Sequence, residues 1–166
     1  MLNADFFPAF YQTNLWVEKV LNEWVKDENQ YRLLQEALAK LKYDFFEDKM
    51  APALVGPMMV YQAIKGELDE PLFILAAAHT FFYASLDLFD DIEDHELEPR
   101  IWKELGFESA INVGNSLLFL SLMTLDYLTS FPQLLELKQL FIQTGWHLSV
   151  GQQRDIFSRS QSFLPV

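Results

Sequence analysis

Residues 72–96 read LFILAAAHTFFYASLDLFDDIEDHE. The first half of this stretch is one of the most apolar runs in the chain, and the second half carries Asp87, Asp90, Asp91 and Asp94. A long apolar run without alternating polar residues predicts a buried helix. Like charges one turn apart destabilise a helix by about 0.2–0.5 kcal/mol per pair, so a buried helix that ends this way needs a compensating partner.

The four carboxylates share one side of the predicted helix. At about 100° per residue, the other three fall within about 100° of Asp90. A solvated, exposed helix end is the simpler interpretation. The alternative is a divalent cation, because Mg²⁺ prefers carboxylate oxygens and commonly binds one or two of them together with substrate phosphates. Asp90 and Asp94, one turn apart, have the spacing that such an ion requires.

His79 and Tyr83 project from the same side of this helix, one to three turns before the aspartates. A single histidine on an apolar helix is more often a satisfied core residue than a ligand. The sequence therefore leaves both interpretations open for this pair.

The rest of the chain also predicts helices, and we expect one all-α domain over residues 1–166 with about six of them. Apolar residues recur at helical spacing, and no window alternates as a strand would. Glycines and prolines set the expected limits, with Pro71 opening the apolar helix and Pro99 closing it. The expected helices cover about 15–26, 31–41, 52–66, 71–94, 108–128 and 132–160, with a short helical piece before Gly106.

Composition excludes several classes of protein. Hydrophobic residues make up 51% of the chain and aromatic residues 15%, which excludes disorder and indicates a large apolar core or cavity. The formal net charge of −12 disfavours nucleic acid and anionic membranes as partners, so a phosphate ligand would need metal ions between. Because the chain has no cysteine, disulfides and thiol chemistry are excluded.

We expect a cytoplasmic protein without a membrane span. The N-terminal residues MLNADFFPAF lack the basic and apolar regions of a secretory signal. The run from Leu72 to Phe89 approaches spanning length, but His79, Ser85 and Asp87 interrupt it and no basic flanks accompany it.

Four segments resemble motifs of one family, in the same order. DDIED at 90–94 has the form DDxxD, and KMAPALVGPMMVYQAIKGELDEPLFILAAAHT at 49–80 is similar to a basic-RP-x-L block followed by an Ala-rich helix. ELGFESAINVGNSLLFLSLMTL at 104–125 is similar to a helix with AI-x-x-GD-x-LL, and SVGQQRDIF at 149–157 matches GQ-x-x-D. The chain therefore resembles the N-terminal half of the trans-isoprenyl diphosphate synthases, the polyprenyl synthetase family.

This resemblance implies a helical bundle around an apolar cavity. In that family Mg²⁺ held by aspartates binds the diphosphate of an allylic substrate, and the allylic carbon is then attacked by the double bond of isopentenyl diphosphate. By position, Asp90 and Asp94 would be metal ligands and Asp91 would support them. Asp155 would bind a metal, directly or through water, or support the aspartates.

The resemblance also implies substrate-binding positions. Lys49 and Arg100 are the cations available for diphosphate, Gln152 lies in the GQ-x-x-D motif, and Phe82 and Leu86 match the floor of the product cavity. Alternative readings are a polar helix contact for Gln152 and Asp155, and a structural role for His147.

Four departures from the family pattern bear on activity. The basic GKR-x-RP motif appears here as EDKMAP, with only Lys49 as a cation, and Arg100 stands where the family has two arginines. Asn115 replaces the aspartate of the GD pair, and no second aspartate-rich box follows GQQRD. We therefore expect a truncated enzyme or one completed by another chain, as a homodimer or with a partner subunit.

Two functions stay open at this level. The first is a Mg²⁺-dependent prenyltransferase acting on allylic diphosphates, with terpene-cyclase chemistry as a variant. The second is a non-catalytic helical partner or apolar-ligand-binding protein of the same fold. A ferritin-type metal bundle is disfavoured because the chain contains no Glu-x-x-His pair.

Overall fold

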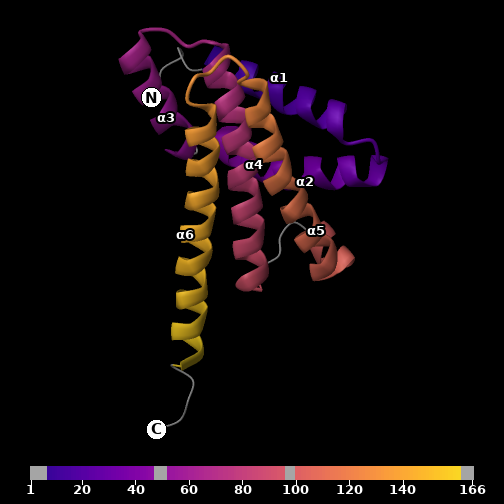
Figure 1. Cartoon of the computed structure of the whole chain (residues 1–166). Coiled ribbons are helices and arrows are strands. Elements are labelled where there is room, and N and C mark those ends of the chain that lie inside the picture. The colour runs from indigo at the N-terminus through magenta and orange to yellow at the C-terminus, as the bar shows by residue number, and fades with distance from the viewer. Residues whose placement is uncertain (1–6, 47–51, 96–99, 162–166) are drawn as a thin grey trace. The chain divides into compact units, whose positions relative to one another are not determined.

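The computed structural model describes residues 7–46, 52–95 and 100–161 (Figure 1). These residues are almost entirely helical, and the described part of the chain contains no β-strand, so the predicted all-α fold class is confirmed. The elements are α1 (Phe7–Trp24), α2 (Glu28–Phe46), α3 (Pro52–Lys65), α4 (Glu70–Glu93), α5 (Arg100–Thr124), the 3-10 turn η2 (Leu125–Tyr127) and α6 (Leu134–Gln161).

The chain divides into two compact units, Met1–Leu128 and Thr129–Val166. The first unit contains α1 to α5 and η2, and the second contains α6. The single domain over 1–166 that the sequence predicts stays a prediction.

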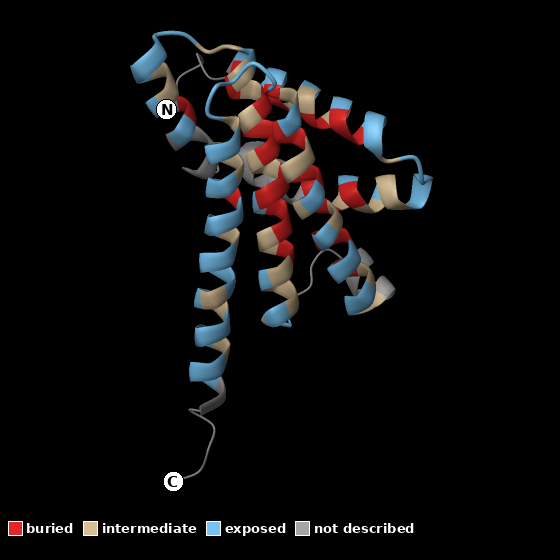
Figure 2. Ribbon diagram, in the orientation of Figure 1, coloured by how far each residue is buried: buried red, intermediate tan, exposed pale blue. Residues whose placement is uncertain are grey.

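Helix α4 is the centre of the first unit. It contacts α1, α2, α3, α5 and η2, and Figure 2 shows buried residues along most of its length. Its core positions follow helical spacing and pack against apolar faces of α1, α2 and α5. The α4 members of this cluster are Ala77, Phe81, Ala84 and Leu88, joined by Val17, Val20, Leu21, Leu34, Ala37, Leu38, Ala110, Val113, Leu117 and Leu120.

The apolarity of α4 is accounted for by this central position. Among the described residues it is the one helix long and apolar enough to cross a membrane, and 56% of its most apolar window is buried inside the protein. A smaller cluster of Ala9, Met58, Leu72 and Ala76 packs α1 and α3 against the first turns of α4.

Helices α4 and α5 approach each other closely at Gly114. A Cβ built on Gly114 would lie 2.8 Å from two carbons of the Phe89 ring, which is nearer than real Cβ contacts allow. The buried hydroxyl of Ser85 donates a hydrogen bond of 2.9 Å to the carbonyl of Gly114. A glycine without a side chain therefore lets the α4 ring and the α5 backbone meet just before the aspartates.

The start of α2 differs from the prediction. The sequence suggested that the polar residues DENQ precede the helix, whereas α2 begins at Glu28. The reason is an N-cap: the Asp27 carboxylate accepts a 2.8 Å hydrogen bond from the N–H of Gln30. The polar stretch is therefore the first turn of the helix, and the Gln30 side chain reaches across to donate to the Ser116 hydroxyl of α5.

Helix α1 begins at Phe7, earlier than the expected start near residue 15. Two other boundaries lie at glycines. α5 is interrupted at Gly106, whose φ of 82° and ψ of 170° are not helical, so the predicted break between a short piece and a long helix is confirmed. Between α3 and α4, Gly66 has a φ of 83°, and Tyr61 donates to the Asp69 carboxylate. Burial and this hydrogen bond raise the pKa of Tyr61 to about 12.

Replacing Gly114 with alanine should destabilise the first unit. The added methyl group would overlap the Phe89 ring, and overpacking of this kind costs about 1–3 kcal/mol. Chemical denaturation monitored by circular dichroism would show a lower midpoint for Gly114→Ala. The double variant with Phe89→Leu should recover part of the loss, because it removes the aromatic carbons at the contact.

Gly151 provides the matched control in the second unit. Nothing lies within 4 Å of a Cβ built there, and Gly151 is helical, so Gly151→Ala should be neutral or stabilising by up to about 1 kcal/mol. Equal effects of the two substitutions on the midpoint would contradict the steric explanation.

Candidate functional site

The four aspartates lie where α4 leaves the core. Leu88 is the last buried residue of the helix, at 4% exposure. Of the four carboxylates, Asp90 is exposed, and Asp87, Asp91 and Asp94 are intermediate in exposure. None of these carboxylates is without an interaction partner. The cluster therefore stays in partial contact with water, as the solvated-end interpretation also predicts.

Regular helical hydrogen bonding holds Asp90 and Asp94 one turn apart. The N–H of Asp94 donates to the Asp90 carbonyl at 2.9 Å, and Asp94 is the C-cap of α4. His95 then adopts a left-handed conformation with a φ of 60°, and its ring packs edge-on against Phe107 at 6.0 Å between centroids. The end of α4 is thereby anchored to the residue that follows the break in α5.

The spacing of these carboxylates fits Mg²⁺ only in part. Among the described residues, no group of three or more histidine, aspartate or glutamate side chains is arranged to hold a metal ion. A cage made of protein side chains alone is therefore missing from these ranges. Asp90 and Asp94 match the other mode, in which one or two carboxylates bind Mg²⁺ and water and phosphate oxygens complete the shell.

His79 is largely buried in the middle of α4. Its Nδ1 is inaccessible to solvent and has no hydrogen-bond partner among the described residues. Burial lowers the pKa of His79 below the ordinary value of 6.5. Its ring stacks on Tyr83 with centroids 6.5 Å apart and 20° between the planes. Tyr83 is 40% exposed, so the pair forms a stacked aromatic unit from the interior toward the surface.

The two α4 positions assigned to a product cavity differ in burial. Phe82 is 6% exposed and Leu86 is intermediate. Both precede the aspartates on the same helix, as the resemblance requires. Their role in limiting chain length stays a prediction.

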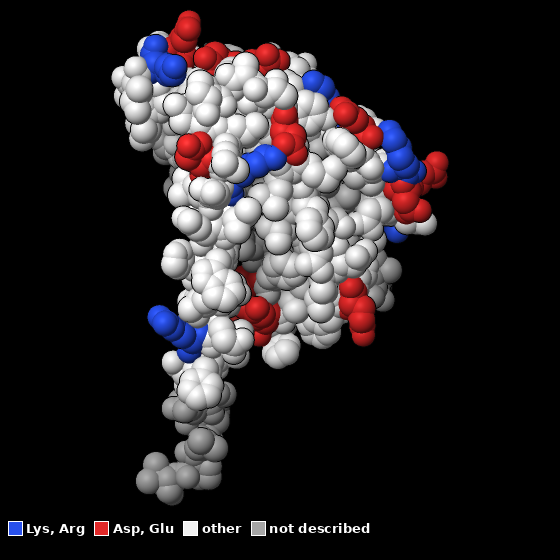
Figure 3. All heavy atoms as spheres, viewed as in Figure 1, with Lys and Arg blue, Asp and Glu red and all other residues white. Residues whose placement is uncertain are grey.

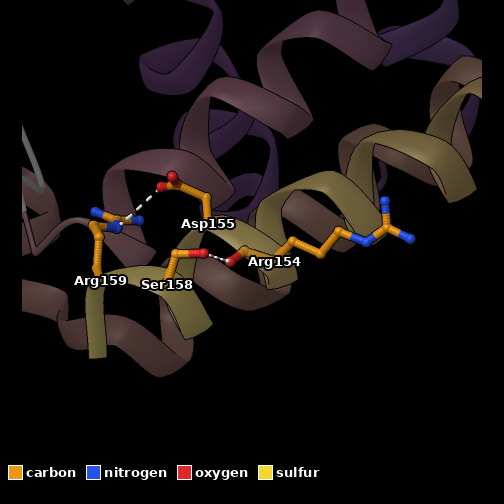
Figure 4. Close-up of polar contacts among 4 residues, drawn as sticks. All are labelled: Arg154, Asp155, Ser158 and Arg159. Carbon is orange, nitrogen blue, oxygen red and sulfur yellow. Dashed lines mark hydrogen bonds and ion pairs between the residues drawn. The ribbon is translucent and has the colours of Figure 1, made fainter. Parts of the chain in front are cut away.

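Gln152 and Asp155 lie on α6, in the second unit. Gln152 is intermediate and Asp155 is exposed. Asp155 forms an ion pair with Arg159 at 3.0 Å, whereas the Arg154 side chain points away from that pair (Figure 4). The Arg154 carbonyl accepts a 2.9 Å hydrogen bond from the Ser158 hydroxyl. Any metal contact of Asp155 would compete with Arg159.

The remaining predicted residues are exposed or have side chains outside the described residues. Lys49 lies outside the described residues, and Arg100 begins α5 but its side chain is also outside them. Asn115 and His147 are exposed on α5 and α6. On the face shown in Figure 3, acidic and basic side chains form small separate groups on a largely uncharged surface.

Sequence reasoning missed two features near α4. No sequence pattern predicts the contact of His95 with Phe107, because a histidine in the left-handed conformation has no pattern of its own. A cation–π contact was also missed: the Lys19 ammonium lies 3.7 Å from the centroid of the Trp16 ring and 4.9 Å from that of Tyr127. The helical spacing of Trp16 and Lys19 was readable, but their pairing with η2 was not.

Comparison with known proteins finds one partial similarity of interest. The chain is 34% identical over 77 residues to the tryptophan prenyltransferase ComQ of Bacillus subtilis subsp. natto (strain BEST195). The match covers 46% of this chain and 24% of the length of that relative. No family model matches the chain, and no solved structure matches it. The similarity supports a prenyltransferase-like relationship.

The buried imidazole of His79 predicts a pH-dependent stability. Above pH 6.5 it is neutral in both states, but as the pH falls through 6.5 the unfolded chain takes up a proton that the folded chain resists. The free energy of unfolding should therefore decrease with falling pH, by up to about 1.4 kcal/mol per pH unit. Denaturant titrations between pH 7 and about 5.5, above most carboxyl titrations, would measure this slope.

His79→Phe should flatten the slope, because it keeps a flat ring beside Tyr83 without a titrating group. The exposed His147 is the control, and His147→Gln should leave the slope unchanged. An identical slope in wild type and His79→Phe would show that another group is responsible.

Proposed function

We propose that this protein is a Mg²⁺-dependent prenyltransferase of the trans-isoprenyl diphosphate synthase type, acting on an allylic diphosphate. The observation that carries the proposal is the DDIED box at the solvent end of the central helix α4. The all-α fold and the partial similarity to a prenyltransferase support it. Completion of the site by another chain, as a homodimer or with a partner subunit, is part of the proposal.

The proposed roles are those that the family resemblance implies for these side chains. Asp90 and Asp94 would hold Mg²⁺ together with the substrate diphosphate, and Asp91 would support them. Asp155 lies in the second unit and stays a proposed metal ligand; in the structure its carboxylate is paired with Arg159. When bound, Mg²⁺ neutralises charge on the diphosphate and stabilises it as a leaving group.

The reaction proposed for this site is a substitution at the allylic carbon. The bond between that carbon and the diphosphate oxygen breaks, and pyrophosphate leaves with the electron pair. The double bond of the acceptor then forms a bond to the allylic carbon, and the cation left on the acceptor is neutralised by loss of a proton from a neighbouring atom. Phe82, Leu86 and Tyr83 would keep water from the allylic chain, and aromatic faces favour positive charge by about 0.5–2 kcal/mol each.

Two molecules are candidates for the acceptor of the allylic group, and the relative suggests one of them. Isopentenyl diphosphate needs cations for its diphosphate, and the matching positions offer only Lys49 and Arg100. The relative is described as a tryptophan prenyltransferase. An uncharged indole needs no basic site, so a tryptophan side chain is the second candidate acceptor.

Replacing either metal-binding aspartate should weaken substrate binding. Calorimetry with farnesyl diphosphate should show heat that depends on Mg²⁺ and disappears with a chelator. Asp90→Asn and Asp94→Asn should each lower the affinity roughly tenfold or more, since each removes a charged oxygen ligand. Glu93→Gln is the control for net charge, because it removes one negative charge from the same turn at a position that is not a proposed ligand, about 100° around the helix from Asp94.

Equal losses of affinity in Glu93→Gln and in the aspartate variants would show that the effect comes from net charge alone. Absence of Mg²⁺-dependent heat and of a thermal shift would count against the metal site altogether. With binding established, products would be compared for isopentenyl diphosphate and a tryptophan-containing peptide as acceptors. Binding without either product would favour the non-catalytic alternative.

A further inference from the structure

The last turn of α4 lacks the features that keep a helix end folded. Residues 90–94 read DDIED, so all of them except Ile92 are acidic, and the last turn contains no basic residue. Acidic side chains at the carboxyl end of a helix oppose its dipole, and carboxylates one turn apart repel each other. This turn should therefore fray unless another part of the protein holds it.

The proposed metal ligands depend on the order of this turn. Asp94 is the C-cap of α4, and its N–H donates the 2.9 Å hydrogen bond to the Asp90 carbonyl that keeps the two residues one turn apart. Where that bond opens, the two carboxylates no longer share one side of a helix. The fraction of molecules with a folded last turn is therefore the fraction in which both carboxylates can reach one ion.

His95 follows the C-cap and has an unusual backbone conformation. A left-handed residue is common at this position, and glycine adopts that conformation at the least cost. His95 has a φ of 60°, and among the described residues it is the only one besides glycines with a positive φ. The imidazole should therefore make an interaction that a glycine could not provide.

That interaction is the edge-to-face contact with Phe107. The two ring centroids are 6.0 Å apart with 82° between the planes, which is a favoured geometry for aromatic rings. Gly106, with a φ of 82°, breaks α5 directly before Phe107. The chain therefore turns at both His95 and Gly106, and the two rings meet between these turns.

The part of α4 before this turn is held by other contacts. The Ser85 hydroxyl bonds to the Gly114 carbonyl, and the Phe89 ring lies against the same glycine. Asp94 lies five residues beyond Phe89, about 7.5 Å further along the helix. None of residues 90–95 is buried, so the core does not enclose this end (Figure 2).

We propose that His95 and Phe107 are positioning residues for the aspartate pair. Their ring contact, which we call the α4 clasp, holds the last turn folded so that Asp90 and Asp94 are presented together. The clasp acts on the affinity for Mg²⁺ and diphosphate through the helix, without touching either. Its effect on binding rests on the proposed function, whereas its effect on the order of the last turn does not.

The first experiment measures the order of the last turn by hydrogen–deuterium exchange, resolved by residue with NMR. Exchange of the Asp94 amide reports the opening of its hydrogen bond to the Asp90 carbonyl. Loss of one aromatic pair shifts such an opening equilibrium roughly two- to tenfold, enough to leave a fraying helix end mostly open. Phe107→Ala should therefore speed this exchange roughly two- to fivefold, whereas Phe107→Tyr, which keeps the ring, should change it less than about 1.5-fold.

Two controls separate the clasp from a general loss of stability. The amide of the buried Leu88 is the internal reference, because a less stable protein would also exchange faster there. Ile111→Ala is the matched variant: Ile111 lies one turn after Phe107 on α5 and is 43% exposed, against 44% for Phe107. It should leave exchange at Asp94 within about 1.5-fold of wild type.

The second experiment measures binding by calorimetry with Mg²⁺ and farnesyl diphosphate. Phe107→Ala should weaken binding roughly two- to fivefold, because only molecules with a folded last turn are competent to bind. His95→Asn removes the ring and keeps a residue that tolerates the left-handed conformation, so it should have the same effect. The double variant should bind no more weakly than either single variant, since both remove one contact.

Unchanged exchange at Asp94 in Phe107→Ala, or an equal increase in Ile111→Ala, would overturn the clasp. Faster exchange with unchanged affinity would overturn its positioning role. A double variant that adds the two losses would give His95 and Phe107 separate roles and contradict the proposal. If wild type shows no Mg²⁺-dependent heat while Phe107→Ala still speeds exchange, the proposed function fails and the clasp stands.

Discussion

The close contact of Gly114 with the Phe89 ring is the constraint on which the arrangement of the first unit depends. It sets how near α5 can come to α4, and the Ser85 hydrogen bond to the Gly114 carbonyl fixes the two helices at that level. The DDIED segment, with Asp90 and Asp94, begins one residue after Phe89. The packing of a glycine therefore determines the position from which the carboxylates extend beyond the core.

Much of this fold was predictable because its signals are local. The apolar run before the aspartates has helical spacing and a proline at its start, so α4 was expected close to where it lies. Gly106 broke α5 as expected, since a positive φ suits glycine. The start of α2 was wrong because DENQ resembles a loop in composition, while Asp27 acts as a cap through one hydrogen bond.

The candidate site was predictable as a set of residues rather than as a geometry. Helical periodicity places Asp90 and Asp94 together, and the C-cap of α4 keeps them one turn apart. The anchoring of that end by His95 and Phe107 depends on two segments meeting in space, which periodicity does not encode. The same is true of the His79 Nδ1, which has no hydrogen-bond partner among the described residues because of the neighbours that surround it.

The contacts of Tyr127 with two tryptophans give the protein an intrinsic fluorescence probe. Trp16 meets Tyr127 edge-on at 5.3 Å, and the Trp24 indole N–H donates to the Tyr127 hydroxyl at 3.2 Å. Two indoles of α1 thus share one phenol on η2, whereas Trp146 is solvent-exposed on α6. Emission from the first pair reports the docking of α1 on η2, and emission from Trp146 reports events on the other unit.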